Sequence, residues 1–287
     1  MRLRITFILT LVVVVATVSA AFAVRGETAR PGGRTTVVAA FYPLAYAARQ
    51  IGGNRVTVTN LTPAGAEPHD LELSPDDVAK VKAADVVLLL GHGFQPQLER
   101  SAAGAEGHVL TLLDTPGLER SGSDPHVWLD PVRYAVLVRA IGVALDAEAP
   151  AARLVVRLRA LDREYRTGLA RCTRRELVTN HAAFGYLAGR YGLMQVPVEG
   201  LSPEAEPSPR NLTRVVRTVR QASATTVFSE TLVSPRVADA VGRETGARTS
   251  VLDPLEGLTA HAAAQGEDYF TAMRANLASL RKGLGCR

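Results

Sequence analysis

Strand-like and helix-like segments alternate along most of the chain. Residues 35–41 and 85–90 are apolar runs rich in β-branched residues, and residues 55–61 alternate between apolar and polar positions as half-buried strands do. Helical segments lie between them; one of these opens with Ser74-Pro75, which supplies an N-cap and a proline at the first helical position. Strands that alternate with helices predict parallel α/β layering for the first half.

A long helix and a second α/β series follow. Apolar residues recur at helical spacing over residues 151–169, and the arginines that flank them are expected to face solvent. The strands predicted after this helix are at residues 176–179, 195–198, 225–229 and 248–252. We therefore expect two lobes with the long helix as their connector. The expected divisions are an N-terminal lobe at 34–149, a linker helix at 150–171 and a C-terminal lobe at 172–287.

The first 23 residues have the features of an export signal. Arg2 and Arg4 precede an apolar stretch, and Ala21-Phe-Ala23 has the small-x-small form of a cleavage site. Residues 5–24 also approach the roughly 20 residues that span a bilayer, so an uncleaved anchor is the alternative. In either case the sequence predicts an extracytoplasmic protein: periplasmic, secreted, or held at the cell surface.

Composition and cysteine content narrow the class of protein. The chain is 47% hydrophobic and 21% charged, as expected for a soluble globular protein with a sizeable core. Its net charge of +5 is spread along the chain without a basic block that contains aromatic residues, which argues against nucleic-acid binding. In an exported protein the two cysteines, Cys172 and Cys286, suggest one disulfide, and two free thiols are the alternative.

Three histidines and one aspartate lie close to the ends of predicted strands. His69 lies in the loop after the strand at 55–61, His126 lies before a helix, His181 follows the strand at 176–179, and Asp253 closes the last strand. In α/β sheets, ligands bind beyond the carboxyl ends of the strands, so these side chains are expected to meet in a cleft between the lobes. Three imidazoles and one carboxylate match a tetrahedral zinc shell.

Several acidic residues near these candidate ligands have two interpretations. Asp253 taken alone could equally be a turn residue or a helix N-cap. Glu230 could face the cleft or form a local cap or salt bridge. Asp70 and Asp124 are candidates for carboxylates that orient the imidazoles, a task that backbone carbonyls also perform.

A set of motifs between about residue 35 and residue 286 carries a family resemblance. They are Phe41-Tyr-Pro-Leu44, Asn60-Leu-Thr-Pro-Ala-Gly-Ala-Glu-Pro-His-Asp70, Asp124-Pro-His-Val-Trp-Leu-Asp-Pro131, His181-Ala-Ala-Phe-Gly-Tyr-Leu187, Gly200-Leu-Ser-Pro-Glu-Ala-Glu-Pro-Ser208, Phe228-Ser-Glu-Thr-Leu-Val-Ser-Pro235 and Leu252-Asp-Pro-Leu-Glu-Gly257. With these motifs the chain resembles the zinc-type solute-binding proteins of metal-uptake ABC transporters.

The resemblance implies a fold and a ligand set. It implies two Rossmann-like α/β lobes, each a mainly parallel sheet with flanking helices, joined by one long rigid helix, with metal between the lobes. It implies that His69 and His126 supply ligands from the N-terminal lobe, and His181 and Asp253 from the C-terminal lobe. A cysteine pair that joins the end of the linker to the C-terminus also fits the family.

The resemblance further implies a function. Manganese-type relatives typically have Glu in place of the third His, and imidazole-rich shells suit Zn²⁺, so His181 argues for zinc. We expect a monomer that is not an enzyme, captures Zn²⁺ and delivers it to an ABC permease and its ATPase. A manganese- or iron-binding member of the family is the alternative. A zinc hydrolase is the rival class, and an extracellular adhesin is a role that the resemblance also allows.

Two features depart from the family pattern. Many zinc-type members carry a His- and Asp-rich loop between the first two ligand histidines, whereas this interval holds only His92 and His108. Many relatives are lipoproteins, and no cysteine lies near the N-terminal segment of this chain. We therefore expect neither metal capture by such a loop nor lipid attachment at the N-terminus.

Overall fold

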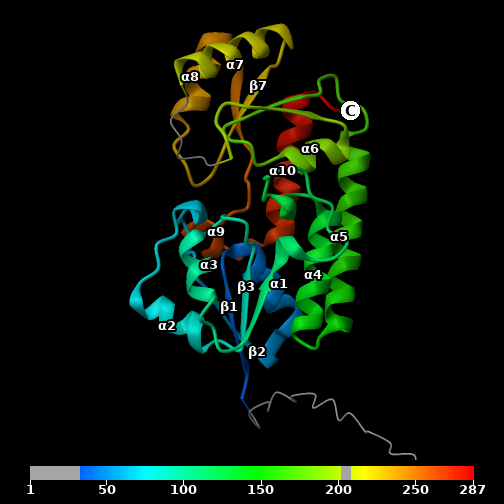
Figure 1. Cartoon of the computed structure of the whole chain (residues 1–287). Coiled ribbons are helices and arrows are strands. Elements are labelled where there is room, and N and C mark those ends of the chain that lie inside the picture. Colours follow the sequence, from blue (N-terminus) through cyan, green and yellow to red (C-terminus); the bar gives the residue numbers. More distant parts are fainter. Residues whose placement is uncertain (1–32, 202–207) are drawn as a thin grey trace, which may run out of the picture. The chain divides into compact units, whose positions relative to one another are not determined.

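Two four-stranded parallel sheets form the framework of the described residues, which are 33–201 and 208–287 (Figure 1). The first sheet has the strand order β2-β1-β3-β4 and the second the order β6-β5-β7-β8, and every strand pair is parallel. The strands of the first sheet are β1 (Thr35–Ala39), β2 (Val56–Asn60), β3 (Val86–Leu89) and β4 (His108–Thr111). Those of the second are β5 (Glu176–Thr179), β6 (Met194–Pro197), β7 (Thr226–Ser229) and β8 (Arg248–Val251). This confirms the prediction of two parallel α/β lobes.

Helices connect the strands in both halves. In the first half they are α1 (Tyr42–Gly52), α2 (Pro75–Ala83), α3 (Pro96–Ala102) and α4 (Pro131–Ala144), with the 3-10 helices η1 (Gly53–Arg55), η2 (Pro68–Asp70), η3 (Leu112–Asp114) and η4 (Val127–Leu129). In the second half they are α6 (Gly185–Tyr191), α7 (Pro209–Gln221), α8 (Arg236–Thr245), α9 (Ala260–Ala264) and α10 (Tyr269–Leu284). The short helices α3 and α9 were not predicted, because five to seven residues carry little periodic signal.

Local side chains explain where several helices begin. Ser74 and Asp77 form a reciprocal capping box at the start of α2. The Asp130 carboxylate accepts the Val132 N–H at the start of α4.

None of the helices in the described ranges is both long and apolar enough to cross a membrane. The predicted export signal lies outside these ranges.

The long helix α5 (Glu148–Leu169) follows the first sheet and precedes the second. It contacts α1 and α4 from the first half and α6 and α10 from the second. Leu154, Leu158 and Tyr165 on its inner face are buried, while its flanking arginines are exposed, which confirms the amphipathic prediction. The rigidity of this helix stays a prediction.

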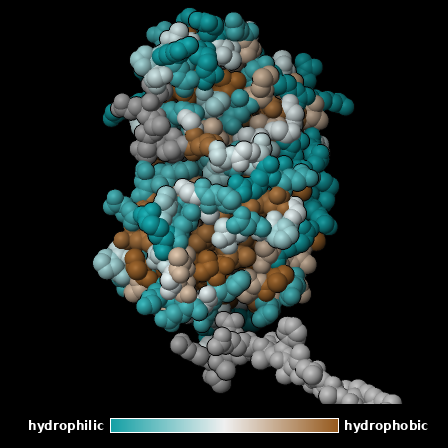
Figure 2. Space-filling model, in the orientation of Figure 1, coloured by the Kyte–Doolittle hydropathy of each residue, from teal (hydrophilic) through white to brown (hydrophobic). Residues whose placement is uncertain are grey.

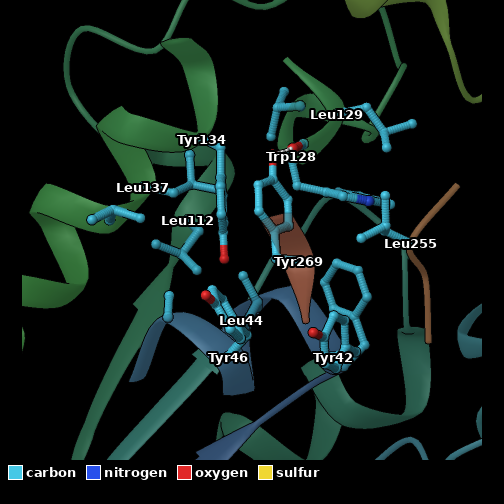
Figure 3. Packing of buried hydrophobic residues seen from close by; sticks show 14 of the residues in the cluster. Tyr42, Leu44, Tyr46, Leu112, Trp128, Leu129, Tyr134, Leu137, Leu255 and Tyr269 are labelled. Carbon is cyan, nitrogen blue, oxygen red and sulfur yellow. Dashed lines mark hydrogen bonds between the residues drawn. The ribbon is translucent and has the colours of Figure 1, made fainter. Parts of the chain in front are cut away.

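The main hydrophobic core is shared by the two halves (Figure 3). Tyr269 of α10 lies 4.6 Å from Tyr134 of α4, measured between ring centroids, and donates a hydrogen bond of 2.7 Å to the carbonyl of Trp128. The Trp128 Nε1–H donates in turn to the Pro254 carbonyl at 2.8 Å. A smaller core, which includes Val227, lies in the second half alone. The segments that carry the candidate ligands thus lie against one continuous core.

A disulfide joins Cys172, just after α5, to Cys286, just after α10. It encloses a sequence separation of 114 residues. In the chain-entropy model a cross-link over about 100 residues stabilises a fold by about 4 to 5 kcal/mol. It ties the C-terminus to the end of α5.

The surface over α7 and α8 in the second half is mainly hydrophilic (Figure 2).

Candidate metal centre

Four side chains from four loops converge on one point. His69 lies in η2, His126 directly precedes η4, and His181 lies two residues beyond the end of β5. The fourth residue is Glu256, in the loop after β8. Each residue offers one ligand atom, and these atoms all lie within 4.8 Å of one another. We call this group the four-residue site.

The distances within the four-residue site fit a small tetrahedral cation. The Oε1 atom of Glu256 lies 3.3 Å from His69 Nε2, 3.1 Å from His126 Nε2 and 3.4 Å from His181 Nε2. Four ligand atoms about 2.0–2.1 Å from a zinc ion, at the corners of a tetrahedron, lie about 3.3–3.4 Å from one another. The three distances from Glu256 Oε1 to the imidazole nitrogens therefore match the spacing of ligands in a zinc shell.

Carboxylates orient two of the imidazoles. His126 Nδ1 lies 2.7 Å from Asp124 Oδ1, and His181 Nδ1 lies 2.7 Å from Glu230 Oε1. A proton on each Nδ1 is donated to the carboxylate, which leaves Nε2 as the metal-binding nitrogen. The same carboxylates also accept the backbone N–H groups of His126 and His181. Each carboxylate therefore holds both the backbone and the ring of its histidine in place.

Several buried polar atoms at the centre of the site make no hydrogen bond with any described residue. They are His126 Nε2, His181 Nε2 and Glu256 Oε2; the two nitrogens lie at ion-pair distance from Glu256 Oε1 but are not aligned for a hydrogen bond. A buried polar atom without a partner costs about 1 to 3 kcal/mol, so such atoms are rare and call for an explanation. A cation held by the nitrogens and the carboxylate satisfies them together.

The charges of the site are strongly coupled. Burial alone would raise the pKa of Glu256, but the three imidazoles around it hold that pKa well below its usual range. Burial opposes protonation of His181, yet the adjacent Glu230 and Glu256 carboxylates raise its pKa to about 10. The pKa of His126 is raised in the same way, because Asp124 and Glu256 outweigh the effect of burial. Without metal, protons on the imidazoles balance the buried carboxylates.

Asp253, expected as the fourth ligand, is not part of the four-residue site. Its Oδ1 atom accepts the Leu255 N–H at 2.7 Å, which closes a turn directly after β8. Leu255 has a φ of 53°, and the turn brings the next residue, Glu256, to the imidazoles. Asp253 thus lies in the turn position that was its alternative interpretation. In the sequence, Glu256 is part of the motif at 252–257. The spacing of Asp253 and Glu256 does not indicate which of the two acids points towards the imidazoles.

The structure also locates the other acidic residues of the candidate motifs and a further histidine. Asp124 and Glu230 contact the imidazoles as described, whereas Asp70 is exposed. Glu67, which was not predicted, accepts the His69 N–H with one oxygen and has no partner for the other among the described residues. Burial and the nearby Glu256 charge raise its pKa to about 9, so it is protonated at neutral pH. His92 pairs with Asp114 away from the site.

The fold and the site define a class of protein. Two parallel α/β units place a cluster of three imidazoles and one carboxylate beyond the carboxyl ends of their strands, which is the arrangement of a two-lobed metal-binding protein. The model of the family "Zinc-uptake complex component A periplasmic" (ZnuA) matches residues 37–283. The chain belongs to this family.

Individual relatives agree with this membership. The chain is 34% identical over 281 residues to the zinc-binding lipoprotein AdcA of Streptococcus pneumoniae, a match that covers 87% of this chain but only 56% of AdcA. It thus spans about half the length of that relative. It is 32% identical to the high-affinity zinc uptake system protein ZnuA of Bacillus subtilis, with 91% of each chain covered.

A solved structure has the same fold. The Zn(II)-bound ZnuA-like domain of Streptococcus pneumoniae AdcA superposes with a TM-score of 0.76 at 34% identity. The superposition covers 88% of this chain and 99% of that domain.

Proposed function

We propose that this protein binds Zn²⁺ with high affinity outside the cytoplasm and delivers it to the permease of an ABC importer driven by an ATPase. The observation that carries the proposal is the convergence of three imidazole Nε2 atoms on the Glu256 carboxylate at tetrahedral spacing. The names of its relatives, which are zinc-binding and zinc-uptake proteins, support it.

Each residue of the site has a role in the proposed binding. His69, His126, His181 and Glu256 are the ligands. Asp124 and Glu230 hold two imidazoles in the tautomer that presents Nε2, and they stabilise the positive charge that the rings share with the ion. The N-terminal lobe, 34–149, supplies two ligands and the C-terminal lobe, 172–287, supplies the other two.

The ligand set favours capture over catalysis. Zinc enzymes use three protein ligands and keep the fourth position for water or substrate, whereas here four protein side chains lie close enough to bind one ion together. Three imidazoles favour Zn²⁺ over Mn²⁺, which prefers oxygen ligands. A monomer with one such site fits the task of carrying a single ion to a membrane permease.

Metal content and competition test the proposal. We expect mass spectrometry of the purified protein to find one zinc per chain, and competitive titration to show that Zn²⁺ displaces Mn²⁺. His181→Ala should lose the stoichiometric zinc, whereas His92→Ala, which removes an imidazole outside the site, should retain it. A preference for manganese, or a metal content far below one per chain, would overturn the proposal.

A further inference from the structure

Helix α6 of the second half holds the loop that carries His126. The Ser121 N–H donates to Tyr186 Oη at 2.9 Å, and the Tyr186 hydroxyl donates to the Asp124 carbonyl at 3.1 Å. Tyr186 is buried, and Asp124 is the residue whose carboxylate contacts His126 Nδ1. A single hydroxyl from the second half therefore bridges two points of the loop that orients a ligand of the first half.

Gly185, the first residue of α6, lets this loop approach. A Cβ atom at this position would lie 2.8 Å from Asp124 Oδ2, closer than side-chain atoms normally pack. Gly185 is exposed and has no left-handed backbone that would call for glycine. The requirement for a small residue here comes from the Asp124 carboxylate itself.

Two arginines fasten α6 to the start of α4. Arg190 of α6 and Arg133 of α4 both pair with the buried Asp130 carboxylate. The guanidinium of Arg133 also lies over the Tyr186 ring, 4.7 Å from its centroid. Asp130 comes four residues after His126, so α6 contacts the His126 loop on both sides of the ligand.

We infer that Gly185 and Tyr186 are positioning residues for zinc, which hold Asp124 so that it directs His126 Nε2 at the ion. This inference rests on the proposed function. Because α6 begins four residues after His181, the contact couples the ligand segments of the two halves. Movement of α6 away from residues 121–130 would turn His126 out of line and speed the release of the metal.

The substitution Tyr186→Phe tests the inference, because it removes the hydroxyl and keeps the ring over which Arg133 lies. We expect zinc to dissociate about three- to tenfold faster into an excess of chelator, since one or two hydrogen bonds that orient a ligand are lost. The stoichiometry should remain one. The visible spectrum of the Co²⁺-loaded variant should differ from that of the wild type, because the ring orientation of one ligand changes.

Tyr165→Phe is the matched control. Its hydroxyl is also buried and donates to the Met273 carbonyl at 2.6 Å, in the packing of α5 against α10. It should lower thermal stability to a similar extent but leave the zinc dissociation rate and the Co²⁺ spectrum unchanged. Equal acceleration in both variants would mean that the effect is one of global stability and would overturn the inference.

Gly185→Ala provides a second, independent variant. It should push Asp124 away and also speed zinc release while Tyr186 keeps its hydroxyl. If the wild type binds zinc and both variants at α6 release it at the wild-type rate, the positioning role is wrong although the proposed function stands. If the wild type binds no zinc, the proposed function fails and this inference fails with it.

Discussion

The acid that reaches the three imidazoles is determined by the turn at residues 253–255. Asp253 is half-buried and Glu256 is fully buried. The Asp253 carboxylate accepts the Leu255 N–H, whereas Glu256 Oε1 lies within 3.4 Å of all three Nε2 atoms. Burial raises the pKa of Asp253 to about 6, whereas the imidazoles keep Glu256 ionised. The imidazoles therefore stabilise the charge of Glu256, whereas burial opposes the charge of Asp253.

Substitution of the two acids separates their roles. Glu256→Gln should weaken zinc binding by more than about a hundredfold, because a charged ligand is lost at the centre of the site. Asp253→Asn keeps an oxygen that can accept the Leu255 N–H, so it should retain affinity within about tenfold of the wild type. Competition against a chelator of known affinity measures both. A larger loss for Asp253→Asn than for Glu256→Gln would return Asp253 to the ligand set.

The histidines also make the stability of the metal-free protein depend on pH. His181 has a folded pKa of about 10 against an ordinary value near 6.5, so its protonation stabilises the fold fully below about pH 6.5, and this contribution is lost as the pH rises through 10. The melting temperature in chelator should therefore fall between pH 6.5 and 10. Zinc needs unprotonated Nε2 atoms, so the increase in melting temperature on zinc addition should grow over the same range.

Thermal melts with zinc and with chelator, at steps from about pH 5 to about pH 10, provide the check, because this range contains both the ordinary histidine value and the raised pKa of His181. A zinc-induced increase that is the same at every pH would show that the imidazoles do not exchange protons for metal. Zinc affinity measured across the same range should weaken as the pH falls, because protons then compete for the ligands.

At the scale of the elements, the close approach of α4 and α5 determines how the first half meets the connector. A Cβ atom at Gly142 of α4 would lie 2.5 Å from the Ala151 Cβ of α5, so the two helices touch at a position that tolerates only glycine. The turn between them includes Asp146, which has a φ of 46°. Together these features direct α5 back along α4 towards the second half.

Gly142→Ala should therefore lower the free energy of unfolding by about 1 to 3 kcal/mol, the usual cost of overpacking a tight contact. Gly189→Ala in α6 is the matched control, because a Cβ there meets no atom within 4 Å and the φ is not left-handed. That control should be neutral or stabilising by up to about 1 kcal/mol. Denaturant titration of both variants measures the free energy of unfolding. Equal losses of this free energy in the two variants would contradict a special role for the contact at Gly142.

At the scale of the whole molecule, the two halves share one core while each has its own sheet. Tyr269, which follows the second sheet, packs on Tyr134 and bonds to the Trp128 carbonyl in the first half. Helix α5 contacts helices of both halves. Because these contacts do not pass through the four-residue site, they should persist whether or not metal is bound.

Small-angle scattering tests this prediction. The radius of gyration of the protein in zinc and in chelator should agree within experimental error, since wide hinge closure would have to break the shared core. A large compaction on zinc addition would show that the connector bends.

Much of the fold was accessible from local patterns. Strands such as residues 85–90 and the amphipathic helix at 151–169 depend on periodicity within a short window. Of the three histidines, His181 closely follows a strand, whereas His69 and His126 lie in longer connections after β2 and β4. The common strand order of the two sheets was not accessible, because the halves reach it with different side chains and no repeat is visible in the sequence. Glu67 and the contacts of α6 were likewise absent from any local pattern.

The sequence by itself determined the alternation of strands and helices and the amphipathic helix at 151–169, and it predicted His69, His126 and His181 as imidazoles of the site. Only the tertiary structure brought Glu256, and not Asp253, to the three imidazoles and placed Asp124 and Glu230 against two of the rings. The physical reason is distance. The type of each element follows from neighbours a few residues away. A metal site instead depends on distances between side chains from loops far apart in the chain, and these distances must be right to within tenths of an ångström. Here one hydrogen-bonded turn determines which acid reaches the site.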